Sequence, residues 1–213
     1  MKLNQAEKEL KDLSDKLTTI RRANAAVLQE RIKAALIDLN FLDVRFSMEF
    51  RRLSHYTVSG FDEAEFVIST NPGEPERSLG QVASGGELSR IMLAIKTVLA
   101  DSDDIPTLIF DEIDTGISGR TAQRVAEKLA VIARNHQVIC ITHLPQIASM
   151  ADCHFEIKKS TDGASTKTRI TSLKEDEAVT ELARLLGGAQ ITDAVLQNAR
   201  EMKELAWQTK THN

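Results

Sequence analysis

The sequence has 213 residues, of which 42% are hydrophobic and 27% charged, so it is too apolar for a disordered chain and long enough for one large domain or a domain with an appendage. No apolar run approaches the roughly 18 residues of a membrane span, and residues 1–10 alternate charge with leucine, unlike a signal peptide, so we expect a cytoplasmic protein with no membrane contact. The formal net charge of −4 gives no overall electrostatic reason to bind nucleic acid.

The charge is unevenly distributed along the chain. Residues 1–52 carry 11 Lys and Arg against 8 Asp and Glu, whereas residues 53–213 carry 16 against 23. We therefore expect any DNA contact on the first quarter of the chain. With one Trp, one Tyr and seven Phe, we expect no aromatic-rich platform for stacking single-stranded bases.

The first 40 residues have the spacing of a coiled-coil strand. Apolar or tolerated positions recur at alternating intervals of three and four over about four heptads. They are Leu3, Ala6, Leu10, Leu13, Leu17, Ile20, Asn24, Val27, Arg31 and Ala34. Beyond Val27 a broader apolar stripe predicts that the helix enters a globular body there. The alternative is an ordinary surface helix.

Strands are predicted after this helix. Residues 42–51 alternate apolar and polar side chains, which is typical of a half-buried strand, and a second extended stretch over 62–70 is expected to pair with it in antiparallel fashion. The run Asn71-Pro72-Gly73-Glu74-Pro75 predicts a turn or loop.

A glycine-containing segment, Ser84-Gly85-Gly86-Glu87, then begins a predicted helix. Ser84 and Glu87 fit a capping box, while the two glycines add nothing to a cap but allow an anion to approach the free N–H groups. The helix is expected to bury Leu88, Ile91, Met92, Ile95 and Leu99. A phosphate site is favoured over a purely structural helix start.

From Pro106 the pattern changes to short apolar strands at 107–111 and 138–142 separated by a helix at 121–134, which predicts a parallel sheet with a crossover helix. A further strand pair is expected over 153–159 and 166–173, split by Asp162-Gly163. Helices are expected over 176–186 and 193–207. Cys140 and Cys153 lack the spacing of a zinc site or disulfide framework and are expected to be buried.

The strand at 107–111 ends in two adjacent carboxylates, Asp111 and Glu112, which is the form of a Walker B element. Ligands of open α/β sheets bind at the carboxyl ends of strands, where Asp111 would hold Mg²⁺ and Glu112 would orient or deprotonate a water. An acidic turn after a buried strand is the structural alternative. His143 closes the next strand and is expected at the same edge.

The order of a glycine-rich helix start, an Asp-Glu strand end and a His strand end resembles the ABC-type ATPase head, with Asp114 at the D-loop position. The sequence contains no G-x-x-x-x-G-K-[ST], so the Walker A phosphate cradle is missing. A coiled-coil strand directly upstream of the signature motif is similar to the SMC-like ATPases. The longer matches resemble the RecN family of bacterial DNA repair proteins. They are Asn71–Pro75, Val82–Ala94, Phe110–Gly119 and Ile141–Ala148.

This resemblance implies an α/β fold, the C-terminal lobe of an ABC/SMC-type P-loop NTPase head, with parallel strands, crossover helices and antiparallel strands. A coiled-coil stub over 1–40 would lead into a head lobe over 41–213. It also implies ATP and Mg²⁺ as ligands and a role in recombinational repair of DNA double-strand breaks. Met1 is expected to mark a fragment boundary, and the isolated chain to be inactive.

The resemblance further assigns roles to residues. Ser84, Gly85, Gly86 and Glu87 would contact the γ-phosphate held by an opposite head. Asp111 would bind the metal and Glu112 would act in catalysis on the ATP of their own head. Asp114 would communicate across the dimer, and His143 would sense or stabilise the γ-phosphate.

The implied partners are the N-terminal Walker A lobe of the same protein, a second head in an ATP-dependent homodimer, and DNA through the intact protein at the bacterial nucleoid. Lys158, Lys159, Lys167 and Arg169 on the later strand pair are a weaker expectation for DNA contact than for a solvated face. The competing hypotheses are a non-enzymatic coiled-coil assembly module and a fragment of another ABC-type ATPase.

Overall fold

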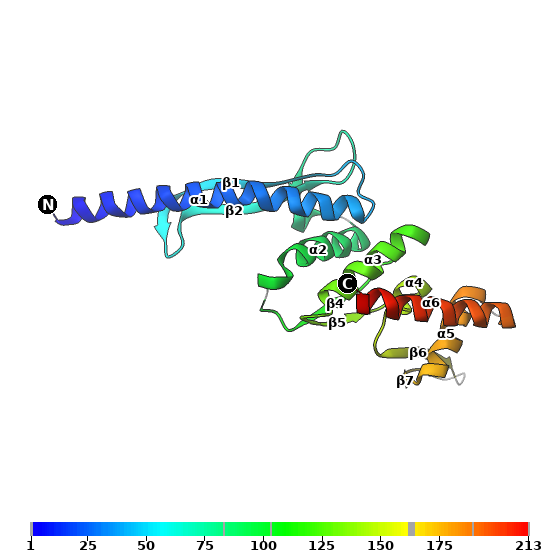
Figure 1. The fold of residues 1–213 in the computed structure, drawn as a ribbon. Coiled ribbons are helices and arrows are strands. Elements are labelled where there is room, and N and C mark those ends of the chain that lie inside the picture. The colour runs from blue at the N-terminus through cyan, green and yellow to red at the C-terminus, as the bar shows by residue number, and fades with distance from the viewer. Residues whose placement is uncertain (1, 83, 103, 162–164, 189, 213) are drawn as a thin grey trace. The chain divides into compact units, whose positions relative to one another are not determined.

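The computed structural model describes residues 2–82, 84–102, 104–161, 165–188 and 190–212 (Figure 1). Its contacts divide the chain into two compact units, Met1–Leu99 and Ala100–Asn213. The predicted division into a coil over 1–40 and a head lobe over 41–213 remains a prediction. Met1, Ala83 of the signature motif and the Asp162-Gly163 turn lie outside the described residues.

The first unit is built on one long helix and a β-hairpin. Helix α1 (Lys2–Asp38) is followed by β1 (Arg45–Thr57), β2 (Gly60–Ser69) and the short β3 (Arg77–Ser78), paired in the order β1-β2-β3. The predicted antiparallel pairing of β1 and β2 is confirmed, with Phe46 opposite Ile68. The hairpin extends to Thr57, beyond the predicted end near residue 51.

The hairpin lies along the middle of α1 (Figure 1). Arg52 of β1 forms an ion pair of 3.2 Å with Asp15, Thr18 donates a hydrogen bond to the carboxylate of Asp62, and Ser14 is buried. The helix therefore packs against strands from Ser14 onward. The prediction that packing begins only after Val27 is wrong, because the hairpin is longer than its alternating segment indicated.

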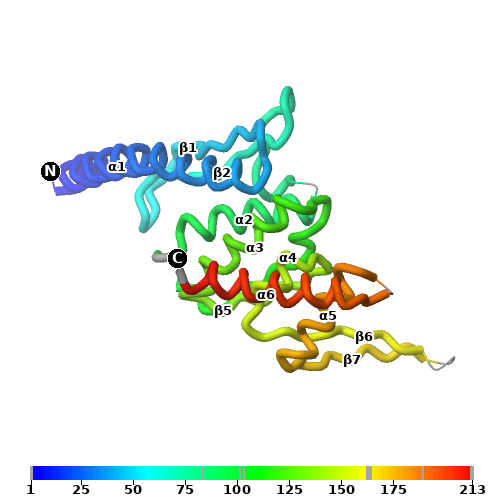
Figure 2. The backbone as a smooth tube through the Cα atoms, turned by 45° about the vertical axis from the view of Figure 1, so that its right-hand side comes forward, coloured from blue at the N-terminus to red at the C-terminus, as the bar shows by residue number. Residues whose placement is uncertain are grey.

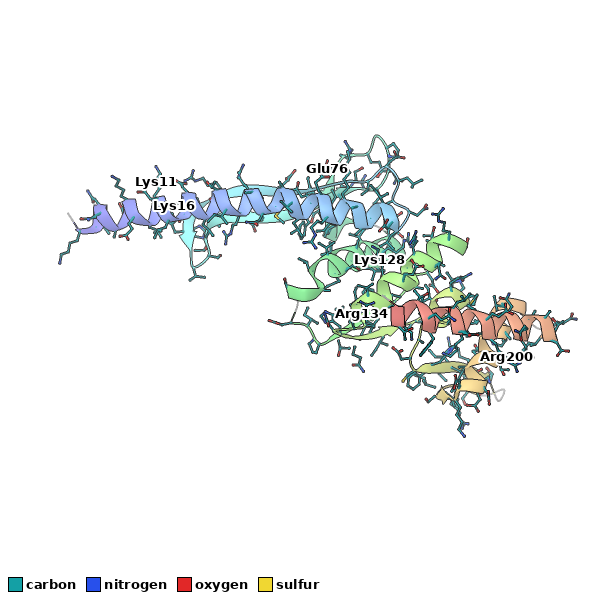
Figure 3. The ribbon with its side chains drawn as sticks, viewed as in Figure 1. Lys11, Lys16, Glu76, Lys128, Arg134 and Arg200 are labelled. Atoms are coloured by element: carbon teal, nitrogen blue, oxygen red, sulfur yellow. The ribbon has the colours of Figure 1, made fainter. Side chains whose placement is uncertain are left out.

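Most large apolar side chains of the predicted heptad seam are exposed on α1. The large exposed side chains on it are Leu3, Leu10, Leu13, Ile20 and Val27. The polar flank of the same helix carries lysines such as Lys11 and Lys16, which project into solvent (Figure 3). Toward its end α1 buries the stripe that was predicted to enter the body. Its buried members are Ile32, Ala35, Leu36 and, just past the helix, Leu39.

The 3-10 helix η1 (Leu79–Gln81) precedes α2 (Gly85–Leu99), which packs against α1. The buried face of α2 consists of Arg90, Ile91, Leu93, Ala94 and Ile95 together with Gly86. The predicted buried face of α2 is wrong in part. Leu88, Met92 and Leu99 are only half-buried, whereas Leu93, which was not predicted to be buried, is fully buried.

The second unit begins with the 3-10 helix η2 (Ala100–Ser102) and contains the predicted strand–helix–strand motif. Strand β4 (Thr107–Phe110) pairs in parallel with β5 (Gln137–Cys140), and α3 (Gly119–Ile132) connects them. Register is set by Leu108 opposite Val138. The parallel sheet with its crossover helix is confirmed.

The rest of the second unit is helical apart from one hairpin. Helix α4 (Pro145–Ala148) leads to β6 (His154–Thr161) and β7 (Thr166–Leu173), an antiparallel pair as predicted, followed by α5 (Glu175–Gly187) and α6 (Asp193–His212) (Figure 2). Helices α5 and α6 pack through Leu182, Ala183 and Ala199. Arg200 lies on α6 (Figure 3).

Two further properties follow from these elements. Cys153 is exposed just before β6 and Cys140 is half-buried, so the expectation that both cysteines are buried is wrong for Cys153. Within the described residues, no helix is long and apolar enough to cross a membrane.

Candidate functional site

The carboxyl ends of β4 and β5 lie side by side. Phe110 is the register partner of Cys140, and the backbone N–H of Ile141 donates a hydrogen bond of 3.1 Å to the carbonyl oxygen of Phe110. Asp111 and Glu112 follow β4 directly, and Thr142 and His143 follow β5. The parallel pairing therefore brings the acidic strand end and the histidine strand end to one edge of the sheet.

The backbone holds the Asp111 carboxylate at this edge. The N–H of Glu112 donates a hydrogen bond of 2.9 Å to Asp111 Oδ1, and both side chains are exposed. Glu112 has a φ of 56°, a left-handed conformation that is uncommon for a residue other than glycine. Such strained positions concentrate at functional sites, so this backbone is a second reason to regard Glu112 as functional.

An exposed carboxylate at a strand end is a suitable ligand for Mg²⁺, which keeps several waters and combines one or two carboxylates with phosphate oxygens. Among the described residues, no group of three or more His, Cys, Asp or Glu side chains is arranged to hold a metal ion. Asp111 is a candidate ligand for a metal ion that is also bound by phosphate oxygens.

Asp114 occupies the turn after Glu112, and its side chain is buried, with 6% exposed. Three groups lie against its Oδ2 atom. They are the hydroxyl of Thr142 at 2.6 Å, the backbone N–H of His143 at 2.8 Å and Nδ1 of His143 at 2.9 Å. Asp114 therefore connects the turn after β4 to the turn after β5 in the same unit.

The environment of Cys140 reports the electrostatics of this edge. Burial raises the pKa of its thiol, and the nearby Asp114 and Asp111 carboxylates add to this shift, which together bring the pKa to about 12. A thiolate is disfavoured there because the edge is partly desolvated and negatively charged.

The second group of predicted residues lies at the start of α2 in the first unit. The N–H of Glu87 donates a hydrogen bond of 3.3 Å to Ser84 Oγ, which is one of the two bonds of the predicted capping box. Gly85 is exposed and Gly86 is buried. The α2 start has the N–H groups and positive dipole end that suit an anion.

The predicted site residues thus fall into two groups, each within its own compact unit. Asp111, Glu112, Asp114 and His143 share the sheet edge of the second unit, and the segment from Ser84 to Glu87 begins α2 of the first. Thr142 was not predicted. Its signal was weak, since a threonine before a histidine predicts no contact until the tertiary structure places a carboxylate beside it.

Comparison with known sequences finds several bacterial proteins named DNA repair protein RecN. The chain is 42% identical over 201 residues to the DNA repair protein RecN of Halalkalibacterium halodurans, covering 92% of this chain and 36% of that protein. It is 49% identical over 155 residues to RecN of Bacillus subtilis, covering 73% of this chain and 27% of that protein. RecN of Vibrio cholerae is 42% identical over 190 residues, which cover 89% of this chain and 34% of the relative. The chain thus spans about a third of the length of these curated relatives, and no family model matches it.

Solved structures show a shared fold at low sequence identity. The Smc head domain with a coiled coil and joint from Pyrococcus yayanosii superposes with a TM-score of 0.54 at 22% identity, over 84% of this chain and 31% of that chain. The Smc head domain with an extended coiled coil from Pyrococcus furiosus also gives 0.54, at 18% identity, over 86% and 43%. The predicted α/β fold class is confirmed by this likeness and by the mixture of parallel and antiparallel strands.

Proposed function

We infer from these matches that the chain is a segment of a RecN-type DNA repair protein with the fold of an SMC head, and we propose that it supplies half of an ATPase head. The observation that carries this proposal is the shared edge of β4 and β5, where Asp111, Glu112 and His143 come together. Neither a non-enzymatic assembly module nor another ABC-type ATPase is favoured by a specific observation.

The residues of the sheet edge would divide the work of ATP hydrolysis. Asp111 would hold Mg²⁺, which neutralises charge on the phosphates when it is bound. Glu112 would accept a hydrogen bond from the attacking water and orient it, and His143 would face the γ-phosphate. At the other unit, Ser84, Gly85, Gly86 and Glu87 would receive the γ-phosphate of a nucleotide held by a second head.

One face of the parallel pair β4–β5 is apolar and exposed, which suggests that another part of the protein covers it. Ile109, Ile139 and Ile141 alternate onto one face and are 68%, 45% and 49% exposed. Parallel sheets are normally covered on both faces, so this apolar face should be covered in the working protein. We propose that the Walker A lobe, which the sequence does not contain, covers it and supplies the phosphate cradle.

The whole assembly would be an ATP-dependent homodimer of heads acting on DNA in double-strand break repair at the nucleoid. The exposed lysines of α1, including Lys11 and Lys16, fit the expectation that DNA contact lies on the first quarter of the chain. Turnover would require both lobes, because positioning and charge neutralisation by Walker A make up most of phosphoryl-transfer catalysis.

The proposal is tested by complementation. The purified chain should hydrolyse ATP no faster than buffer, and adding the separately expressed Walker A lobe of the same protein should produce turnover. A complex made with Glu112→Gln is the matched control, since it keeps the interface and loses the carboxylate. Steady turnover by the chain alone that Glu112→Gln abolishes, or a stable complex without any turnover, would contradict the half-site assignment.

A further inference from the structure

The buried carboxylate of Asp114 is the centre of a hydrogen-bonded polar group at the sheet edge. A buried carboxylate is stable only when donors compensate for its lost hydration. Here the donors are Thr142 and His143, both from the turn after β5. Asp114 is therefore engaged within its own chain, a role the sequence analysis did not assign to it.

The geometry fixes the state of the His143 ring. An ionised carboxylate only accepts hydrogen bonds, so the ring nitrogen at 2.9 Å from Asp114 Oδ2, Nδ1, must carry a hydrogen. The His143 side chain is otherwise 74% exposed. In the neutral ring this leaves Nε2 as an acceptor, and in the charged ring Nε2 is a donor. In either form, Nε2 is the atom offered to a ligand.

Thr142 connects this bonding to the backbone that carries the histidine. Its hydroxyl donates to Asp114 at 2.6 Å and accepts the N–H of Leu144 at 3.0 Å. Both the hydrogen and a lone pair of the hydroxyl are thus used, which leaves one rotamer for the side chain. Thr142 therefore binds both the Asp114 carboxylate and the backbone of Leu144, the residue that follows His143.

We propose that Asp114 and Thr142 are positioning residues that hold His143 as the Nδ1–H tautomer and direct Nε2 toward the nucleotide. This inference rests on the proposed ATPase function. It differs from the expectation that Asp114 acts across a dimer, because the carboxylate already binds its own histidine turn. In such an arrangement the aspartate binds one ring nitrogen of the histidine and thereby orients the other nitrogen toward its ligand.

The tautomer can be observed directly in the 213-residue chain. With ¹⁵N-labelled histidine, two-bond ¹H–¹⁵N correlation spectra identify the protonated ring nitrogen, and His143→Gln assigns the signal. The pH is raised until the ring shifts stop changing, so that the neutral form is seen. Wild type should show Nδ1 protonated. Asp114→Ala should give exchanging tautomers, whereas Asp111→Ala, which removes a nearby carboxylate not bonded to the ring, should leave Nδ1 protonated.

Thr142 gives a graded second test. Thr142→Ser keeps the hydroxyl and should retain the wild-type ring signal, while Thr142→Val removes it at nearly constant volume and should broaden or shift that signal. A wild-type ring protonated at Nε2, or a ring unchanged by Asp114→Ala in a variant whose circular dichroism shows a folded chain, would overturn the inference.

Activity of the two-lobe complex separates this inference from the proposed function. Thr142→Val should lower kcat about 10- to 100-fold with little change in KM for ATP, and Thr142→Ser should restore it. If the wild-type complex hydrolyses ATP and Thr142→Val matches it, the positioning role is wrong and the ATPase function stands. If the tautomer behaves as expected but a stable complex has no turnover, the ATPase function is wrong.

Discussion

Thr18 on α1 donates a hydrogen bond to the carboxylate of Asp62 on β2, 44 residues away in the sequence. The contact is partly buried and charge-assisted, and such bonds contribute about 1.5–3 kcal/mol to stability. It joins α1 to the β1–β2 hairpin, together with the ion pair between Arg52 and Asp15.

We expect Thr18→Val to lower the free energy of unfolding by about 1–3 kcal/mol, because the Asp62 carboxylate loses a partner while the side-chain volume is kept. Thr19→Val is the matched control, since Thr19 bonds only the carbonyl oxygen of Asp15 within the helix, and it should change stability by less than about 0.5 kcal/mol. Urea unfolding followed by circular dichroism measures both. Equal effects of the two variants would show that the contact does not stabilise the unit.

The exposed sheet face gives a prediction about association. Ile139→Asp should leave the chain folded, because Ile139 is already 45% exposed, and should weaken binding of the Walker A lobe at least tenfold. Val131→Asp, at an exposed apolar position on α3 and not on either strand, should have little effect. Isothermal titration calorimetry measures the affinities. Unchanged binding by Ile139→Asp would remove this face from the interface.

Glu112→Gln in the two-lobe complex should retain ATP binding and lose hydrolysis. Asp111 keeps its charge and its bond from the backbone of residue 112, whereas the side chain proposed to orient the attacking water loses its basicity. The expected fall in kcat is about 10²- to 10⁴-fold, the usual contribution of general acid–base catalysis. Nucleotide binding and turnover are measured on the same preparation. Wild-type turnover would exclude Glu112 from the mechanism.

Mixing two inactive variants tests whether the two groups of site residues serve different nucleotides. Ser84→Arg places a bulky cation at the start of α2, and Glu112→Gln removes the proposed base. If one head's Glu112 works with the partner's Ser84, a mixed dimer has one site with both defects and one with neither. Activity should then reappear on mixing, with a maximum near equal amounts. Heterodimers that form but stay inactive would contradict the shared site.

The cysteines should differ sharply in reactivity with thiol reagents. Cys153 is exposed, whereas the pKa of about 12 at Cys140 leaves a thiolate fraction of roughly 10⁻⁴ at pH 8. One thiol per chain should therefore react at pH 8, and the second only after unfolding or with a rate that rises about tenfold per pH unit. Mass spectrometry of labelled peptides identifies the site, and Cys153→Ser should abolish the fast reaction. Rapid labelling of Cys140 in that variant would contradict the assigned environment.

Much of the fold was predictable because its signals are local. The apolar runs before Asp111 and His143 and the helix between them led directly to the parallel pair. The extension of β1 was not predictable, since residues 52–57 lack apolar alternation and are held by tertiary contacts such as Arg52 over the Phe61 ring at 3.7 Å. The buried side of α2 was misplaced because helical periodicity alone does not fix which neighbours a face will meet.

The same distinction between local sequence signals and tertiary contacts applies to the candidate site. Its residue types and their order could be predicted from motifs, because a strand end fixes where a carboxylate lies. The bonds among Asp114, Thr142 and His143 could not, because they join turns 28 residues apart and depend on how each turn closes. The left-handed backbone at Glu112 was also invisible, since nothing in the residue type predicts it.

That backbone has an evolutionary consequence. A non-glycine residue in a left-handed conformation carries roughly 1–3 kcal/mol of strain, which glycine would relieve. Selection for folding alone would therefore drive position 112 toward glycine, and selection for the proposed hydrolytic role would oppose this drift. In descendants that keep the fold but abandon nucleotide turnover, the Glu112 position should be among the first of the sheet edge to change, while the buried Asp114, which also supports the structure, should persist.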